Sequence, residues 1–439
     1  MITILSQQTT NRLQYACKHI FSICMGCEWE VTDHLNGQES FVIQYGKKQP
    51  LPVANLHIPS CGLVFEKGIR PQSITTSQWE GLTTLFPVEI ISDNSQQLPF
   101  DIFSAVFFLL SRYEEYTNPT KDCHGRFPAE ESCAFKHGFL ELPLIDLWCI
   151  KLKEHLLRIN SKLSFQPPKY QFIPTIDVDN VFAYKNHGVL QTSYCCFRDF
   201  LKGKKASAIR RLKAVLRLQP DPYFNLEELH STHKKHNCTP LFFFHCGTFG
   251  KRDKRSIFPS LSYLGVRKKI SQHDVVGMHP SYHCSLKPLL FKIEKLMMVW
   301  HGEERPVRFH YLRMTLPESY ELLLKEGFTS DWSLCYSNLP GFRASTSHPF
   351  LFYNLKTEQE RPLTIYPTAV MDKTLKSDLK LKPEEALTLI FHIKKQVEKV
   401  GGTFITLFHN QHFAHGFGWD TWDELYEKVL DESQIKQNN

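Results

Sequence analysis

Apolar runs of strand length alternate with amphipathic segments of helical periodicity along the second half of the chain. The strand-like runs occupy residues 172–178, 240–245, 274–279, 363–370 and 403–409. A helical pattern over residues 383–400 separates the last two. Such alternation predicts parallel strands joined by helical crossovers. Because the stretch from Phe172 to Leu430 has the length of a TIM-like barrel, roughly 250 residues, we predict a distorted TIM-like (β/α) barrel. A doubly wound sheet is the alternative.

The first part of the chain has a different pattern. Residues 101–116, DIFSAVFFLLSRYEEY, form a helical segment whose unbroken apolar run predicts burial on most sides. The short strand-like runs before it show no regular alternation with helices, which favours an α+β arrangement. Pro167 and Pro168 precede the first strand of the predicted barrel, and we place a boundary there. The prediction is a smaller α+β domain over residues 1–165 and the barrel over residues 166–439.

A long connection, residues 183–239, separates the first two strands of the predicted barrel. We interpret it as a helical insertion that is rich in Lys and Arg. Ile209, Leu212, Val215 and Leu216 fall on one stripe of a helix, and basic residues crowd the rest of it. A solvated helix face fits this pattern, and so does peripheral contact with an anionic glycan or an anionic membrane surface.

Composition narrows the class of protein without naming a partner. With 42% hydrophobic and 22% charged residues, the chain is a folded globular protein. Its formal net charge of +7 makes the chain only mildly basic, which does not identify a nucleic-acid binder, so we predict no nucleic-acid partner. The N-terminus lacks the pattern of a secretory signal, and the conspicuous apolar runs are far shorter than the roughly 20 residues of a membrane span. The 13 cysteines show no framework spacing. We therefore expect a cytoplasmic protein.

Two aspartates end the first strand-like run of the predicted barrel. Asp177 and Asp179 are two residues apart, so they share one side of an extended strand end. In a parallel βα fold the active site collects at the carboxyl ends of the strands. One carboxylate could ligate a metal there while the other accepts a proton from a water molecule. A capping or turn role for Asp179 is the structural alternative.

Two histidines with H-x-x-x-H spacing follow a later strand-like run. His279 and His283 converge on a metal ion when the backbone turns helically between them, and a distant aspartate completes three protein ligands. Two imidazoles and one carboxylate favour Zn²⁺. A chain with 21 histidines also produces such pairs by chance. The pair of aspartates is what makes metal binding the favoured interpretation.

Polar residues also end two further apolar runs. Arg308 stands in RFHY and His409 in TLFHN. A guanidinium near a catalytic carboxylate fixes its orientation and its charge, and a histidine at a strand end can protonate a leaving group. Each residue taken alone fits a satisfied core or rim position equally well. Their joint appearance favours a catalytic role.

In chain order these motifs resemble the polysaccharide deacetylases with the NodB homology domain, also called carbohydrate esterase family four. The matching segments are TIDVDN, GMHPSYH, VRFHYL and LFH, and the resemblance covers about Phe172 to Leu430. The N-terminal part resembles a domain of unknown function with the signature FxLLSRYEEY…HGRF, which precedes such deacetylases in some bacterial proteins. No activity is implied for that domain.

The resemblance implies a distorted (β/α) barrel and metal-dependent hydrolysis of N-acetyl, sometimes O-acetyl, groups on a sugar or glycan. It implies that Asp177 is the general base and that His409 is the acid. Arg308, or alternatively Arg343, would steady Asp177. Without a secretory signal the sugar would be a cytoplasmic or lipid-linked intermediate. The implied ligands of the divalent metal are Asp179, His279 and His283.

The chain departs from the pattern of that family at several positions. Val178 separates the two aspartates, which are commonly adjacent in members, so the roles of base and ligand can be exchanged. His310 stands where the Arg motif usually has a proline, and Cys284 follows His283 where a proline is usual. A glycan-binding relative that has lost its chemistry also fits these motifs, and so does a hydrolase acting on another acyl group.

Overall fold

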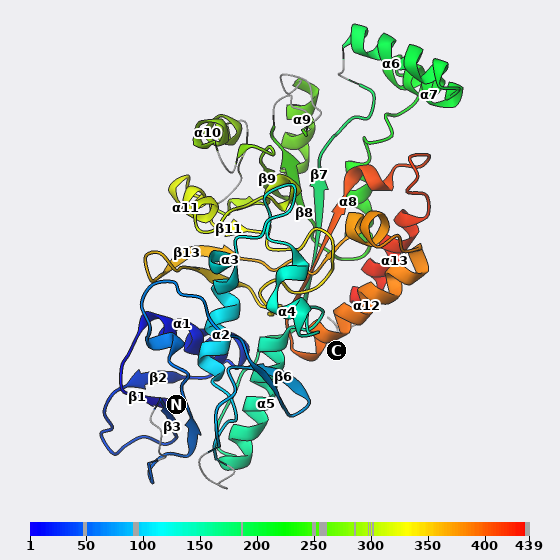
Figure 1. Cartoon of the computed structure of the whole chain (residues 1–439). Coiled ribbons are helices and arrows are strands. Elements are labelled where there is room, and N and C mark those ends of the chain that lie inside the picture. The colour runs from blue at the N-terminus through cyan, green and yellow to red at the C-terminus, as the bar shows by residue number, and fades with distance from the viewer. Residues whose placement is uncertain are drawn as a thin grey trace.

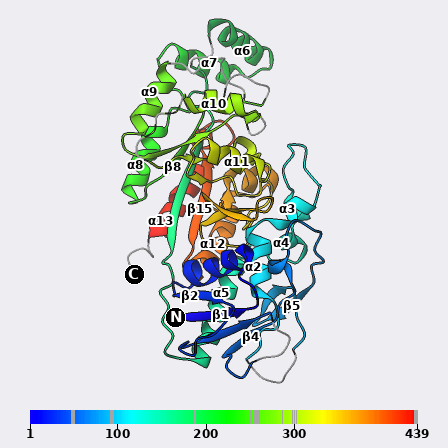
Figure 2. The same cartoon turned by 90° about the vertical axis from the view of Figure 1, so that its left-hand side faces the viewer.

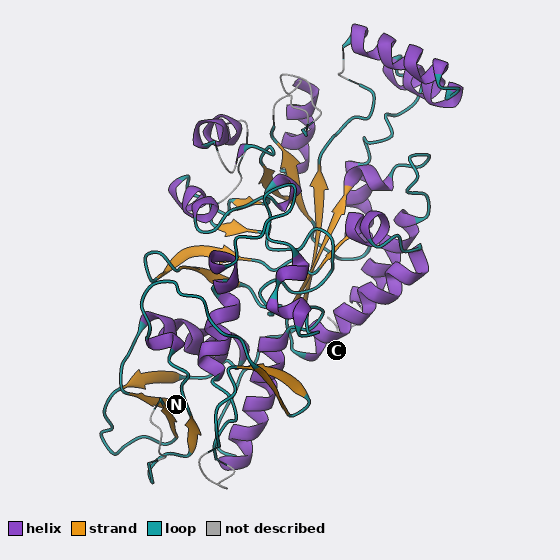
Figure 3. Cartoon of the chain, viewed as in Figure 1, coloured by secondary structure: helices purple, strands orange, loops and turns teal. Residues whose placement is uncertain are grey.

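The computed structural model describes residues 1–434, apart from 47–50, 91–95, 186–187, 248–251, 254–260, 285–286, 297, 299 and 301–302. The N-terminal strands lie at one end of the molecule, and a larger part contains the central sheet (Figure 1). Figures 1 and 2 agree that a pair of helices, α6 (Val189–Leu201) and α7 (Lys205–Val215), projects at the opposite end. Helices flank the strands of the central sheet (Figure 3). The protein has a mixed α/β structure with parallel sheets.

Four parallel strands in the order β2-β1-β3-β4 form the sheet of the N-terminal part. This sheet differs from the expected α+β arrangement, although β5 and β6 form a small antiparallel pair beside it. β1, β3 and β4 are buried throughout, and such short strands carry no period-two pattern that would reveal their direction. The elements are β1 (Ile2–Ser6), α1 (Asn11–Cys17), β2 (Trp29–Thr32), β3 (Val42–Tyr45), β4 (Leu56–Ile58), β5 (Thr76–Trp79), β6 (Leu82–Leu85), α2 (Ile102–Leu110), α3 (Tyr113–Thr117), α4 (Cys133–Lys136) and α5 (Leu144–Ile159).

Nine strands form the central sheet, in the order β12-β13-β11-β10-β9-β8-β7-β15-β14. All neighbours are parallel except β12 and β13, which form an antiparallel pair. The strands are β7 (Gln171–Val178), β8 (Leu241–His245), β9 (Val275–His279), β10 (Pro306–Val307), β11 (Ser330–Asp331), β12 (Phe350–Asn354), β13 (Gln359–Ile365), β14 (Val370–Met371) and β15 (Thr403–His409).

The central sheet is curved, but the structure does not show that it closes into the predicted distorted TIM-like barrel. Among the described residues, β12 and β14 are the edges of the sheet and no ladder joins them. The sheet nonetheless curls. Its curvature is evident from Trp332, next to β11, which packs with Phe243 of β8 and Ile405 of β15 in one apolar cluster. A closed barrel and a curled open sheet share the same alternation of strands and helices, so the sequence pattern does not separate them.

The alternation of side chains along β7 decides which residues reach the inner face of this sheet. Ile176 and Val178 join an apolar core with residues of α8, α9, α12 and α13. Thr175 and Asp177 point the other way, toward the side chain of Arg308. The helices of this part are α6 (Val189–Leu201), α7 (Lys205–Val215), α8 (Leu226–Lys235), α9 (Leu261–Ile270), α10 (Pro288–Leu296), α11 (Glu318–Lys325), α12 (Pro383–Lys399) and α13 (Trp422–Gln434). Among the described residues, no helix is both long and apolar enough to cross a membrane.

The sequence explains both ends of α12 and the start of β15. Pro383 occupies the first turn of the helix, where its missing N–H group is not needed. Gly401 follows the helix with φ +65°, and a Cβ atom on it would lie 2.2 Å from the carbonyl oxygen of Pro168. Glycine is therefore required at position 401, because the backbone there passes too close to Pro168 to leave room for a side chain.

The helix expected over residues 101–116 is broken into α2 and α3. Arg112 stands between them with φ +55°, in the left-handed region that ends an α-helix. Its guanidinium donates to Glu114 at 2.7 Å and to Glu115 at 2.9 Å. The break directs the carboxylates of Glu114 and Glu115 into the interior. The apolar run in the sequence did not predict that they would be buried.

An ionic cluster joins α3 to the second part of the chain. Both oxygens of the buried Glu115 carboxylate accept from Arg343, at 2.8 and 2.6 Å, and Arg112 donates to the same carboxylate. Burial raises the pKa of Glu115, but the charges of Arg343 and Arg112 outweigh it and hold the pKa at about 2. Arg343 is therefore occupied here and does not reach Asp177.

Glu115→Gln should destabilise the protein by about 3–5 kcal/mol, because it leaves two guanidinium groups buried beside a neutral amide. The lowered pKa of Glu115 means that its contribution is complete above about pH 4.5 and is lost as the pH falls toward about 2. The gap between urea midpoints of wild type and variant should therefore narrow over that interval. Glu28→Gln, at an exposed position, is the matched control. A variant as stable as wild type at pH 7 would contradict this account.

Candidate active site

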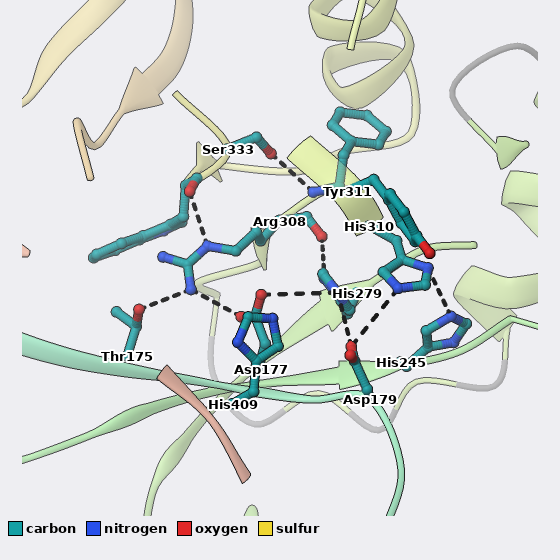
Figure 4. A network of polar contacts seen from close by, with 12 residues as sticks. Thr175, Asp177, Asp179, His245, His279, Arg308, His310, Tyr311, Ser333 and His409 are labelled. Atoms are coloured by element: carbon teal, nitrogen blue, oxygen red, sulfur yellow. Dashed lines mark hydrogen bonds and ion pairs between the residues drawn. The ribbon is translucent and has the colours of Figure 1, made fainter. Parts of the chain in front are cut away.

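The carboxyl ends of several strands surround a pocket of about 450 Å³ in the second part of the chain. Asp177, His279 and His409 lie at the ends of β7, β9 and β15, and Arg308 directly follows β10. Figure 4 shows their side chains converging. The parallel direction of these strands brings together residues that are up to 232 positions apart, such as Asp179 and Gln411.

Arg308 holds Asp177 in a fixed orientation. Its Nη1 donates to Asp177 Oδ1 at 2.8 Å and to Thr175 Oγ1 at 2.7 Å. Its Nε donates to the carbonyl oxygen of Trp332 at 2.9 Å, and the guanidinium lies 4.4 Å from the ring centre of Phe243. The second oxygen of Asp177 stays 3.8 Å from His279 Nε2. One carboxylate oxygen is therefore anchored while the other faces the neighbouring histidine.

Asp179, His279 and His310 form a compact group of possible metal ligands, with all three ligand atoms within 4.8 Å of one another. Asp179 Oδ1 lies 3.4 Å from His279 Nε2 and 3.8 Å from His310 Nε2. Burial raises the pKa of Asp179, but the nearby imidazoles of His279, His310 and His409 lower it far below the usual range. The carboxylate is therefore ionised and ready to bind a cation.

The donor set of this group fits a divalent cation. His279 Nδ1 donates to the carbonyl oxygen of Arg308 at 2.6 Å, which leaves Nε2 as the lone-pair nitrogen that faces Asp179. Within the part of the chain that the structure describes, this buried Nε2 has no hydrogen-bond partner. Two imidazoles and one carboxylate with room for further ligands are typical of catalytic Zn²⁺ sites, and two histidines with one carboxylate also suit Fe²⁺.

Asp253 orients His310 from behind. Its Oδ1 lies 2.9 Å from His310 Nδ1 and 3.2 Å from His245 Nε2, and it accepts the backbone N–H of Tyr282 at 2.9 Å. Burial raises the pKa of Asp253, but these hydrogen bonds outweigh it and hold the pKa well below its usual range. A carboxylate behind a ligating imidazole fixes the ring so that Nε2 points forward. His245 and Asp253 therefore support the group instead of forming a separate one.

The structure places His283 outside the ligand group, where the sequence had placed it inside. Its side chain is exposed and lies against the ring of Tyr282. The expected helical turn after His279 does not form, because the N–H groups of Ser281 and Tyr282 are held by Glu294 and by Asp253. These bonds direct position 283 outward.

The sequence motifs do not single out His310 as a metal ligand. The signal that was available is its place at the end of a strand-like run, where the resembled family usually has a proline. Its backbone is fixed by Phe309, whose N–H donates to Ser333 Oγ at 2.8 Å, and Ser333 donates in turn to Asp331 at 2.7 Å. Tyr311 follows with φ +61°, a costly conformation for a residue other than glycine.

Asp372, directly after β14, holds His409. Its Oδ1 accepts from His409 Nδ1 at 2.8 Å and its Oδ2 accepts from His412 Nδ1 at 2.7 Å. Burial lowers the pKa of His409, but the Asp372 carboxylate, with Asp179 and Asp177 farther away, outweighs it and raises the pKa to about 9. His409 is therefore protonated at neutral pH and can donate a proton into the pocket. The position of Asp372 directly after a strand is the sequence signal that could have revealed its role.

The N-terminal part contributes to the same pocket. His124 and Arg126, from the HGRF segment of the N-terminal signature, line it. Arg126 Nη1 donates to the carbonyl oxygen of Tyr311 at 2.8 Å, and Arg313 Nε donates to that of His124 at 2.8 Å. These bonds hold the turn that directly follows His310. The sequence signature of the N-terminal part therefore lies at the pocket, which the linear pattern did not indicate.

Comparisons with known proteins reach only part of the chain. Residues 2–161 match a family described as "Family of unknown function (DUF7033)". No curated protein matches the chain. One similar solved structure is described as "Crystal structure of putative polysaccharide deacetylase from Mycobacterium smegmatis". It is 16% identical, with a TM-score of 0.38, over 63% of this chain and 92% of that one. A similarity of this size assigns no activity to this chain.

Asp372→Asn should lower the pKa of His409 from about 9, because only the more distant carboxylates of Asp179 and Asp177 then oppose the effect of burial. NMR titration of the His409 ring, in protein stripped of metal, measures this shift. Asp378→Asn removes a carboxylate that pairs with the neighbouring Lys373 and is the matched control. An unchanged His409 titration in Asp372→Asn would show that another group sets its charge.

Proposed function

We propose that this protein is a metal-dependent hydrolase that removes N-acetyl, or O-acetyl, groups from a carbohydrate. The observation that carries the proposal is one pocket that holds a three-ligand group, a carboxylate anchored by a buried arginine and a protonated histidine. The order of the motifs along the chain, which resembles that of the polysaccharide deacetylases, supports the choice of substrate class.

Asp179, His279 and His310 would hold the cation in this proposal, with Zn²⁺ as the favoured ion. A bound divalent ion would polarise the acyl carbonyl group and lower the pKa of water toward about 7. His310 takes the place that the sequence pattern gave to His283. The carboxylate of Asp253 keeps the His310 ring turned toward the group.

The side chains around that group have complementary proton-transfer roles. Asp177 accepts a proton from the attacking water, and Arg308 prevents its carboxylate from rotating out of position. His409 donates a proton to the departing amine, and Asp372 keeps it charged until then. Asp177 and Asp179 both lie near His279, so the roles of base and ligand can be exchanged between them.

The ligand set makes a direct prediction about metal content. Protein purified and dialysed against Zn²⁺ should contain about one equivalent of metal per chain by elemental mass spectrometry. His279→Ala and His310→Ala should each weaken metal affinity by at least the ~10-fold that loss of an outer-shell partner costs, and so lose most of the metal on dialysis. His283→Ala is the matched control and should retain the metal. Loss of metal in His283→Ala, with retention in His310→Ala, would restore the ligand set inferred from the sequence.

Catalysis is tested separately from metal binding. The loaded protein should release acetate from short oligomers of N-acetylglucosamine, and Asp177→Asn should keep its metal while kcat falls by about 10² or more. Acetate release is followed by an enzyme-coupled assay across a panel that includes O-acetylated sugars. Full activity in Asp177→Asn would refute its role as the base. A wild-type chain that holds no metal after loading would favour a glycan-binding relative that has lost its chemistry.

A further inference from the structure

The pair of helices α6 and α7 carries an unusual surface. The α6–α7 hairpin lies in the connection between β7 and β8 and projects beyond the carboxyl ends of the central strands (Figure 1). Along α6, Leu190, Tyr194, Phe197 and Leu201 are spaced by three or four residues and lie on one stripe. Their exposed fractions are 88%, 65%, 63% and 69%. A stripe this apolar normally packs against something.

The second helix repeats the pattern. Ile209, Leu212 and Leu216 lie on one stripe of α7 and its end, and all three are exposed. Leu218, just beyond, is exposed as well. Two consecutive helices therefore leave apolar stripes uncovered within one short segment.

The contact between the two helices is polar. Asp199 of α6 is buried and accepts from Arg211 of α7 at 3.0 Å, with Ser207 as a further donor at 3.4 Å. Asp199 lies on the opposite side of α6 from the exposed stripe, because it follows Leu190 by two and a half turns. The hairpin thus has its ion pair between the helices and its apolar side chains on the outside. A pair of helices that is stable by itself shows the reverse arrangement, with the apolar side chains between the helices.

Charge surrounds these apolar stripes. Between residues 189 and 218 the only acidic residue is Asp199, so this segment alone carries a formal net charge equal to the +7 of the whole chain. Six of the basic residues are exposed, and they flank the stripes and the turn between the helices. The basic residues of the segment are Arg198, Lys202, Lys204, Lys205, Arg210, Arg211, Lys213 and Arg217.

The hairpin is attached next to the candidate active site. Arg210 Nη1 donates to the carbonyl oxygen of His415 at 3.1 Å and lies against the ring of Phe417. The same loop continues to Trp419, which lines the pocket and stacks on His412 at 3.5 Å. Any external surface that binds the hairpin would therefore lie close to the mouth of the pocket.

We propose that the α6–α7 hairpin docks on the surface of an anionic lipid bilayer. The apolar stripes would enter the boundary of the acyl chains, and the surrounding cations would contact lipid phosphates. The helices have 13 and 11 residues, and a membrane span needs roughly 20, so the hairpin lies on the membrane. A nucleic acid would neutralise the cations but leave the leucines and phenylalanines uncovered, which is why charge and apolar surface together favour lipid. This proposal does not depend on the proposed function.

The test uses the full chain and vesicles of known composition. Wild type should sediment with vesicles that contain phosphatidylglycerol, bind weakly to phosphatidylcholine alone, and dissociate as salt is raised. Leu190→Glu combined with Phe197→Glu should weaken binding by about tenfold or more, and so should Lys204→Glu combined with Lys205→Glu. Ile90→Glu changes an exposed apolar residue of the N-terminal part and is the matched control.

Folding and metal content are measured in the same variants. Circular dichroism and metal content should stay at wild-type values in the Leu190/Phe197 variant, because neither residue lines the pocket. Failure of wild type to bind anionic vesicles would overturn the membrane proposal while leaving the proposed hydrolase untouched. Equal binding by wild type and the Leu190/Phe197 variant would overturn it too. Light scattering that shows a wild-type dimer and a monomeric variant would assign the hairpin to contact between copies of this chain.

Discussion

The buried guanidinium of Arg308 is the charge around which the central sheet is arranged. Because the group is enclosed, its N–H donors need acceptors inside the protein and its charge needs a carboxylate. Thr175 and Asp177 of β7, the carbonyl oxygen of Trp332 and the hydroxyl group of Thr368 supply them. These acceptors belong to strands or strand ends that are separated by other strands in the sheet. One side chain can reach them all only if the sheet curls, so the same contacts shape the sheet and hold Asp177.

Two other buried carboxylates of the pocket region, those of Asp253 and Asp372, also have a partner beside them, in each case a histidine ring. Asp253 is held against His310 and Asp372 against His409, which keeps both acids ionised in surroundings that exclude most water. The group formed by Asp179 and His279 differs, because the Nε2 atom of the histidine lacks a hydrogen-bond partner among the described residues. A cation would complete that group. The N-terminal part shares in the arrangement, since one continuous apolar core includes residues of both parts of the chain.

Much of this arrangement was readable from the sequence, because periodicity and end signals act over a few residues. The pattern over residues 383–400 is typical of a helix, and Pro383 and Gly401 mark its ends in the way that the geometry of helix termini requires. The apolar run over residues 172–178 predicted a strand, and β7 has those bounds to within one residue. The boundary between residues 165 and 166 stays a prediction. The apolar stripe on α7 was also predictable from the sequence, but the solvent exposure of its side chains was not.

Tertiary contacts decided which candidates meet. His279 and His283 had the spacing of a ligand pair, but the backbone between them is held by Asp253 and Glu294, distant residues that no local pattern connects to it. His310 entered the group instead because β10 lies beside β9 in the sheet. The sequence by itself determined the elements, the strand ends and the kinds of side chain placed there, since these depend on neighbouring residues. Only the tertiary structure decided the open edges of the sheet and the membership of the site, since both depend on long-range packing.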